Sequence, residues 1–146
     1  MTDADQNVAI GLNALGSDTK GSFSVAVGTS ALAAQNFATA FDTYNSAVGL
    51  NAGLSITTGA SNTIVGALAG DALTNADFNV AIGRSALTDD TLGSRTVAIG
   101  YNALGTQNFT TATNTYNVAV GYQAGVNITT GTANTCLLYT SDAADD

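Results

Sequence analysis

The sequence contains no His, Trp, Pro or Glu, and only 10% of its 146 residues are charged. Without His, and with Lys20 as its one Lys, the chain lacks the usual base of a nucleophile–base catalytic pair. Three basic residues against eleven Asp give a net charge of −8, which argues against the clustered positive surface of a nucleic-acid-binding protein. We therefore expect no enzymatic activity and no nucleic-acid partner.

Motifs for membranes, metals and cofactors are also missing. The longest apolar stretch, residues 64–70, is far shorter than the roughly 20 residues that cross a bilayer, so we expect no membrane insertion. Calcium-binding repeats, phosphate-binding loops and dinucleotide fingerprints do not occur, so we expect no metal, cofactor or catalytic residue. The pair Asp89 and Asp90, with Asp18 at the matching earlier position, is interpreted as solvated turn residues.

What the sequence does contain is a repeat. A five-residue phrase such as Asn79-Val80-Ala81-Ile82-Gly83 occurs seven times, and its final glycines are 17 or 21 residues apart. A longer period of 72 residues also exists, since residues 1–63 match residues 73–135 at about 38 of 63 positions. Such periodicity predicts an all-β parallel solenoid. Its structural turn residues are expected at Gly11, Gly28, Gly49, Gly66, Gly83, Gly100 and Gly121.

Within each phrase the side chains alternate with a period of two, which predicts a strand. We expect the Val and Ile row to fill the coil interior and the Ala row to point outward. The outward row would then pack against a neighbouring copy, or against a second internal layer of a wide solenoid. Each Gly is expected to adopt a positive φ or to let stacked backbones approach. The Asn four residues earlier starts a turn or stacks into a hydrogen-bonded ladder.

Two of the intervals are four residues longer than the others and carry aromatic residues. We expect these segments to protrude as loops. Their aromatic side chains either contact a host cell-surface glycan or protein receptor, or fold back to cap the coil or meet another subunit. The residues concerned are Phe37, Phe41, Tyr44, Phe109 and Tyr116.

The phrases ending in Gly, followed by Ala-Leu or Ala-Gly, resemble the head repeats of trimeric autotransporter adhesins. Residues 117–125 and 128–131 look still more like repeat arrays in phage tail-fibre proteins. The resemblance covers residues 1–135, and it implies a left-handed parallel β-roll that assembles as a homotrimer. Coils of 17 or 21 residues are longer than those of the usual adhesin head.

The resemblance implies a structural segment of a phage tail fibre, located in the virion and involved in host attachment. The alternative is the head domain of a bacterial trimeric surface adhesin, at the cell surface. A more distant alternative is an ice-binding solenoid. Ice binding would require a regular row of Thr in every coil, whereas the Thr-Thr pair at residues 57–58 recurs only at residues 129–130.

Both ends of the chain depart from the repeat. After residue 135 the 72-residue period calls for Ile, Val and Gly, but Cys136, Leu137 and Leu138 follow. Residues 136–146 resemble a translated sequencing adapter, so we expect them to be a non-native, disordered tail after a solenoid of residues 1–135. Met1 aligns with Leu73 inside a repeat, so we expect the natural protein to begin earlier.

Overall fold

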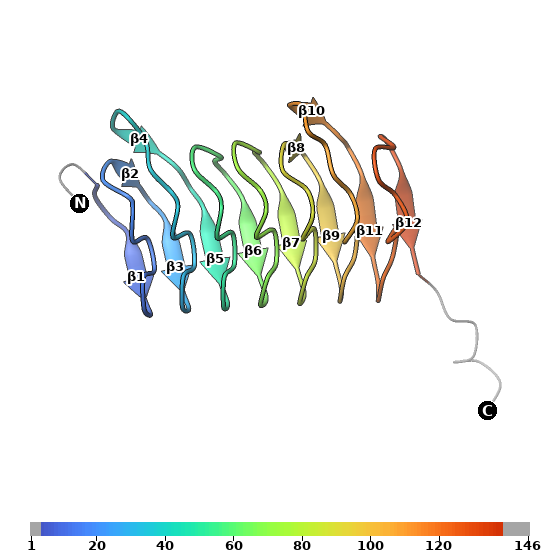
Figure 1. Ribbon diagram of the computed structural model, residues 1–146, viewed down its shortest axis with the longest axis horizontal. Coiled ribbons are helices and arrows are strands. Elements are labelled where there is room, and N and C mark those ends of the chain that lie inside the picture. The colour runs from blue at the N-terminus through green and yellow to red at the C-terminus, as the bar shows by residue number, and fades with distance from the viewer. Residues whose placement is uncertain (1–3, 139–146) are drawn as a thin grey trace.

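The computed structural model describes residues 4–138, which contain no helix and form a single column of stacked coils (Figure 1). Each successive coil contributes one three-residue strand to an eight-stranded parallel sheet, in the order β1-β3-β5-β6-β7-β9-β11-β12. These strands are β1 Val8–Ile10, β3 Val25–Val27, β5 Ser46–Val48, β6 Thr63–Val65, β7 Val80–Ile82, β9 Val97–Ile99, β11 Val118–Val120 and β12 Thr135–Leu137. The predicted parallel β-solenoid is confirmed.

The register of the sheet follows the repeat residue for residue. Ala9 lies beside Ala26, Ala47 beside Ile64, and Ala81 beside Ala98, so each phrase lies on its counterpart from the previous coil. Both lengths of coil are accommodated because the extra four residues leave the main sheet. Each longer coil also contains a short strand, β4 Phe41–Asp42 or β10 Thr113–Asn114, which pairs in parallel with a strand of the 17-residue coil before it, β2 Gly21–Ser22 or β8 Gly93–Ser94.

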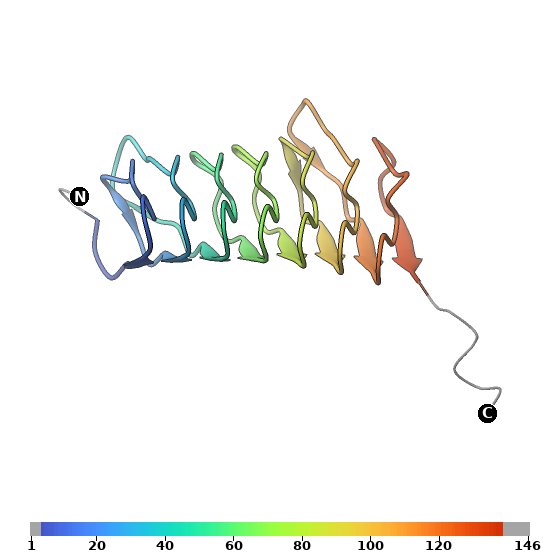
Figure 2. The ribbon, with the colours of Figure 1, turned by 60° about the horizontal axis from the view of Figure 1, so that its bottom comes forward.

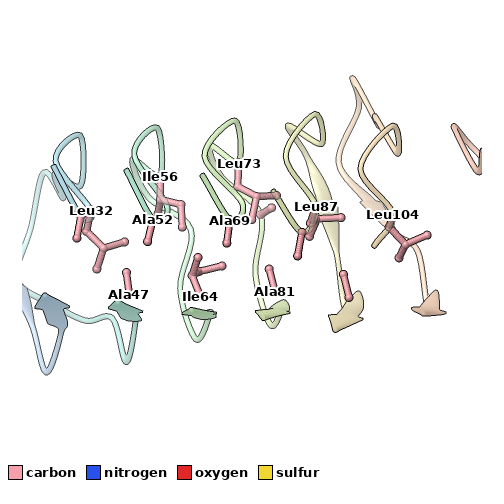
Figure 3. Packing of buried hydrophobic residues seen from close by; sticks show 14 of the residues in the cluster. Leu32, Ala47, Ala52, Ile56, Ile64, Ala69, Leu73, Ala81, Leu87 and Leu104 are labelled. Carbon is pink, nitrogen blue, oxygen red and sulfur yellow. The ribbon is translucent and has the colours of Figure 1, made fainter. Parts of the chain in front are cut away.

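The predicted inside and outside of the strands are reversed in the structure. From the second to the seventh strand of the main sheet, the Ala row, with Ile64 in one coil, is fully buried. No Val or Ile of the other two rows is fully buried. The prediction was wrong because the space behind the sheet is narrow. The opposite leg of each coil already places a Leu or Ile there, which leaves room for a methyl group from most strands (Figure 3).

The large aliphatic side chain of each coil comes from one of two positions. Coils with Leu32 or Leu104 four residues after the phrase use that Leu, whereas coils with Gly at the same place use Ile56 or Leu73 three residues later. The two arrangements exclude each other for steric reasons. A Cβ on Gly70 would lie 2.9 Å from Leu73 Cδ1, so a larger residue and Leu73 would compete for the same space.

The phrase-ending glycines satisfy both of the expected requirements. Their φ values lie between +127° and +138°, a region that is accessible essentially only to Gly. A Cβ on Gly66 would also lie 2.5 Å from the carbonyl oxygen of Gly83 in the next coil. These corners therefore need Gly for the conformation and for the close stacking of backbones.

The Asn residues four positions before these glycines form the expected ladder. Asn62 is fully buried, and its backbone N–H donates to Asn45 Oδ1 at 2.9 Å. Its own Oδ1 accepts from the backbone N–H of Asn79 at 2.9 Å, and its Nδ2 donates to the carbonyl of Ala76 at 2.9 Å. Each Asn thus links its own turn to the coil that follows.

We expect Asn62→Ala to lower the free energy of unfolding by about 2–4 kcal/mol, because one buried carbonyl and one buried N–H lose their partners. Urea unfolding followed by circular dichroism measures the change. Asn75→Ala is the control, since the exposed Asn75 side chain accepts only from the hydroxyls of Thr57 and Thr58. Equal destabilisation by both substitutions would contradict a stabilising role of the buried ladder.

The last strand extends past the predicted end of the array. Cys136 and Leu137 pair with Ala119 and Val120, although we expected disorder from residue 136. Cys136 occupies the inward row and packs against the core. Residues 139–146 of the predicted tail lie outside the described residues.

Candidate functional surface

The most prominent surface is the outer side of the eight-stranded sheet, which we term the apolar face. It consists of two rows of side chains that point away from the core, and none of these residues is buried. The first row is Val8, Val25, Ser46, Thr63, Val80, Val97, Val118 and Thr135, and the second is Ile10, Val27, Val48, Val65, Ile82, Ile99, Val120 and Leu137.

Large side chains continue the apolar face along both of its margins. The residue two positions before the first row is aromatic in four coils, and these rings are exposed: Phe23, Tyr44, Phe78 and Tyr116. Within the described residues, the residue two positions after the second row is Leu or Tyr in four of seven coils, also exposed: Leu12, Leu50, Tyr101 and Tyr122. Stacked rings link neighbouring coils, as in Phe23–Tyr44 with centroids 5.5 Å apart and Tyr101–Tyr122 at 5.1 Å.

Charge is nearly excluded from this surface, although the chain is acidic. The two rows and their margins contain no Asp, and their charged residues are Arg84 and Arg95. Both guanidinium groups lie over aromatic rings, that of Arg95 at 4.9 Å from the centroid of Phe78 and that of Arg84 at 5.7 Å from Tyr101. Such cation–π contacts keep the cations compatible with an apolar surface.

The two longer coils protrude as expected, as loops on the side of the column opposite the main sheet (Figure 2). Phe37 and Phe109 fold back and are each only 7% exposed. Phe41 is half exposed and stacks on Phe37, with ring centroids 5.0 Å apart. Tyr44 and Tyr116 lie apart from the loop tips, on the margin of the apolar face. The five predicted contact residues therefore divide among three environments.

The interpretation of Asp18 and Asp90 as solvated turn residues was wrong. Asp89 is exposed, but Asp18 is 3% exposed and Asp90 is fully buried. Both occupy the inward position that Ile56 and Leu73 occupy in other coils. That equivalence is visible in the sequence, because all four residues lie seven positions after a phrase-ending Gly.

Within residues 4–138 no pocket is found, and no three His, Cys, Asp or Glu residues gather as metal ligands do. The same part of the chain has no helix long and apolar enough to span a bilayer. The extended surfaces described above are thus the candidates for function. No family model, curated protein or solved structure matches this chain, so function is inferred from the geometry of these surfaces.

Proposed function

We propose that the chain is a structural segment of a phage tail fibre, and that its apolar face packs against two further copies of the same chain in a homotrimer. The observation that carries the proposal is an exposed, largely aliphatic face along the whole column, whose second row has Val, Ile or Leu in every strand of the main sheet. A non-enzymatic role in the virion, supporting host attachment, suits a rod built from stacked coils in which equivalent residues recur from coil to coil.

The size of the apolar face supports an obligatory partner. Eight strands at about 4.8 Å spacing, and about six residue steps of 3.3 Å between the margins, give roughly 700 Å². The largest apolar patch on a monomeric protein is typically about 300–600 Å², and a standard specific interface buries about 600–1,000 Å² on each partner. The surface is thus large enough for a specific interface.

The chemistry of the face favours another copy of this chain. Its rows consist mainly of β-branched residues that can pack against the same rows of another copy, and parallel copies around one axis would bring equivalent coils to the same height. The acidic residues lie elsewhere on the chain, where their repulsion keeps the assembly soluble. The number three follows from the resemblance to trimeric fibres, and the same geometry suits the alternative, a bacterial trimeric surface adhesin.

The positions of the aromatic residues suggest separate roles. Tyr44 and Tyr116, on the margin of the apolar face, are proposed as subunit contacts. Phe41 lies on a loop opposite the sheet and would stay accessible in the assembly, so it is proposed to contact a host cell-surface glycan or protein.

We expect the purified chain to sediment at three times its single-chain mass of 14.5 kDa. The physical reason is burial of the apolar face, which is worth about 25 cal/mol per Å² of apolar area before the costs of association. Analytical ultracentrifugation over a hundredfold range of concentration provides the measurement. A monodisperse monomer at every concentration would overturn the proposed assembly.

A further inference from the structure

Two clusters of buried polar side chains lie at the bases of the protruding loops, and we term them the anchor clusters. The first consists of Asp18, Ser24, Gln35, Thr43 and Asn45, and the second of Asp90, Thr96, Gln107, Thr115 and Asn117. No buried side-chain nitrogen or oxygen in the described part of the chain lacks a hydrogen-bond partner. Both clusters are therefore complete hydrogen-bonded networks.

A glutamine forms the centre of each cluster. In the second cluster, Gln107 Nε2 donates to Asp90 Oδ2 at 2.6 Å and to Thr96 Oγ1 at 3.2 Å. Its Oε1 accepts from Asn117 Nδ2 at 2.7 Å. Asp90 Oδ1 also accepts from the backbone N–H of Phe109 at 2.9 Å, which holds the first residues of the loop against the coil below.

The far end of the same loop is held as well. Thr115 is fully buried, and its hydroxyl shares a hydrogen bond with that of Thr96 at 2.7 Å. Its backbone N–H donates to the carbonyl of Ser94 at 2.9 Å. The loop thus leaves and re-enters the coil at two residues, Gln107 and Thr115, that belong to one network.

The first cluster repeats the hydrogen bonds of the glutamine and of the threonine hydroxyl 72 residues earlier. Gln35 Nε2 donates to Asp18 Oδ2 at 2.8 Å and to Ser24 Oγ at 2.9 Å, and Gln35 Oε1 accepts from Asn45 Nδ2 at 2.9 Å. Thr43 at the far end of the loop forms a hydrogen bond with the Ser24 hydroxyl. Both copies of the 72-residue repeat thus combine the network with a protruding loop.

Filling the interior does not require these polar groups. Two coils in the middle of the column neither contain a protruding loop nor precede a coil that contains one. At the positions four and seven residues after the phrase-ending Gly, these coils have the pairs Gly53–Ile56 and Gly70–Leu73. Burying a carboxylate is unfavourable unless hydrogen bonds replace its hydration, so aliphatic filling would serve stability at least as well. Buried Asp and Gln side chains take these inward positions only in a coil that contains a loop and in the coil that directly precedes it.

We infer that the anchor clusters hold both ends of each loop rigidly in place. The residues at the loop tips, 38–42 and 110–114, can then differ while the residues at the loop base stay the same. The two copies support this division. The base residues Gln, Asn, Phe, Thr and Tyr are identical in both, whereas the tips 38–42 and 110–114 differ at three of five positions. This inference concerns the single chain and does not depend on the proposed assembly.

A matched pair of variants tests the inference, with hydrogen exchange of the loop amides as the measurement. Gln107→Met keeps the side-chain volume but removes its hydrogen bonds, so we expect exchange in residues 109–115 to become about tenfold faster or more. Residues 37–43 should keep their protection. Gln35→Met should have the opposite pattern, which makes each loop the internal control for the other.

A graft of the aliphatic filling provides the second variant. L87G/D90I/L104G/Q107L reproduces the Gly53–Ile56 and Gly70–Leu73 pairs beneath the second loop. We expect the solenoid to stay folded, with rapid exchange confined to residues 109–115. Unchanged protection of that loop in the graft and in Gln107→Met would overturn the inference, and so would equal loosening of both loops by either variant.

Discussion

Gly83→Ala is expected to lower the free energy of unfolding by about 4 kcal/mol or more, a large part of the 5–15 kcal/mol that stabilises a typical domain. Gly83 has a φ of +127°, which is strained for any residue with a Cβ. The added methyl group would also lie 2.4 Å from the carbonyl oxygen of Gly100, so the stacked backbones would have to separate. Thermal and urea unfolding followed by circular dichroism measure the effect.

Gly131→Ala is the matched control for this prediction. Gly131 has no positive φ, and the nearest atom to its added Cβ would be Nδ2, at 2.9 Å, at the end of the partly buried Asn134 side chain and not in a stacked backbone. We expect this variant to change stability by less than about 1 kcal/mol. If Gly83→Ala were equally mild, the close stacking of coils at the glycine corners would be incorrect.

The second large effect is expected on the apolar face. The triple variant Val48→Lys, Val65→Lys and Ile82→Lys should convert the proposed trimer into monomers. Each lost aliphatic contact is worth about 1.5–3 kcal/mol when buried, and an unpaired ammonium group in an apolar interface costs more. The fold of the single chain should survive, because all three side chains lie on the outside of the coil. Analytical ultracentrifugation and circular dichroism separate these two results.

The control introduces the same charge on another side of the coil. Ser17→Lys, Ser55→Lys and Ala72→Lys change residues outside the apolar face, none of which is buried. This variant should remain a trimer. A trimer that tolerates lysines on the apolar face, or one that both triple variants dissociate equally, would mean that the interface lies elsewhere.

Repetition made the architecture predictable. Because each coil buries too little apolar surface to fold alone, a regular phrase is stable only when its copies stack. The seven glycines and the Asn positions thus predicted the register that the sheet shows. The loops were predictable for the same reason, since four extra residues cannot enter a coil whose strand must stay in register.

The anchor clusters were missed because residues were judged by polarity and not by their position in the coil. Asp18 and Asp90 are charged, and polar residues between turns usually face solvent. Their positions, seven residues after a Gly, are those of Ile56 and Leu73, whose aliphatic character marks that position as inward. Comparison of equivalent positions in the seven coils would have placed both carboxylates inside.

The sequence by itself determined the stacking of the coils, their register and the sites of the loops, because these depend on spacing along the chain. Only the tertiary structure decided which side of each strand faces the core. That choice depends on the width of the space behind the sheet, which is set by residues of the opposite leg such as Leu32 and Leu73. With that space already occupied, alanines fit inside and the larger valines and isoleucines form the outer surface.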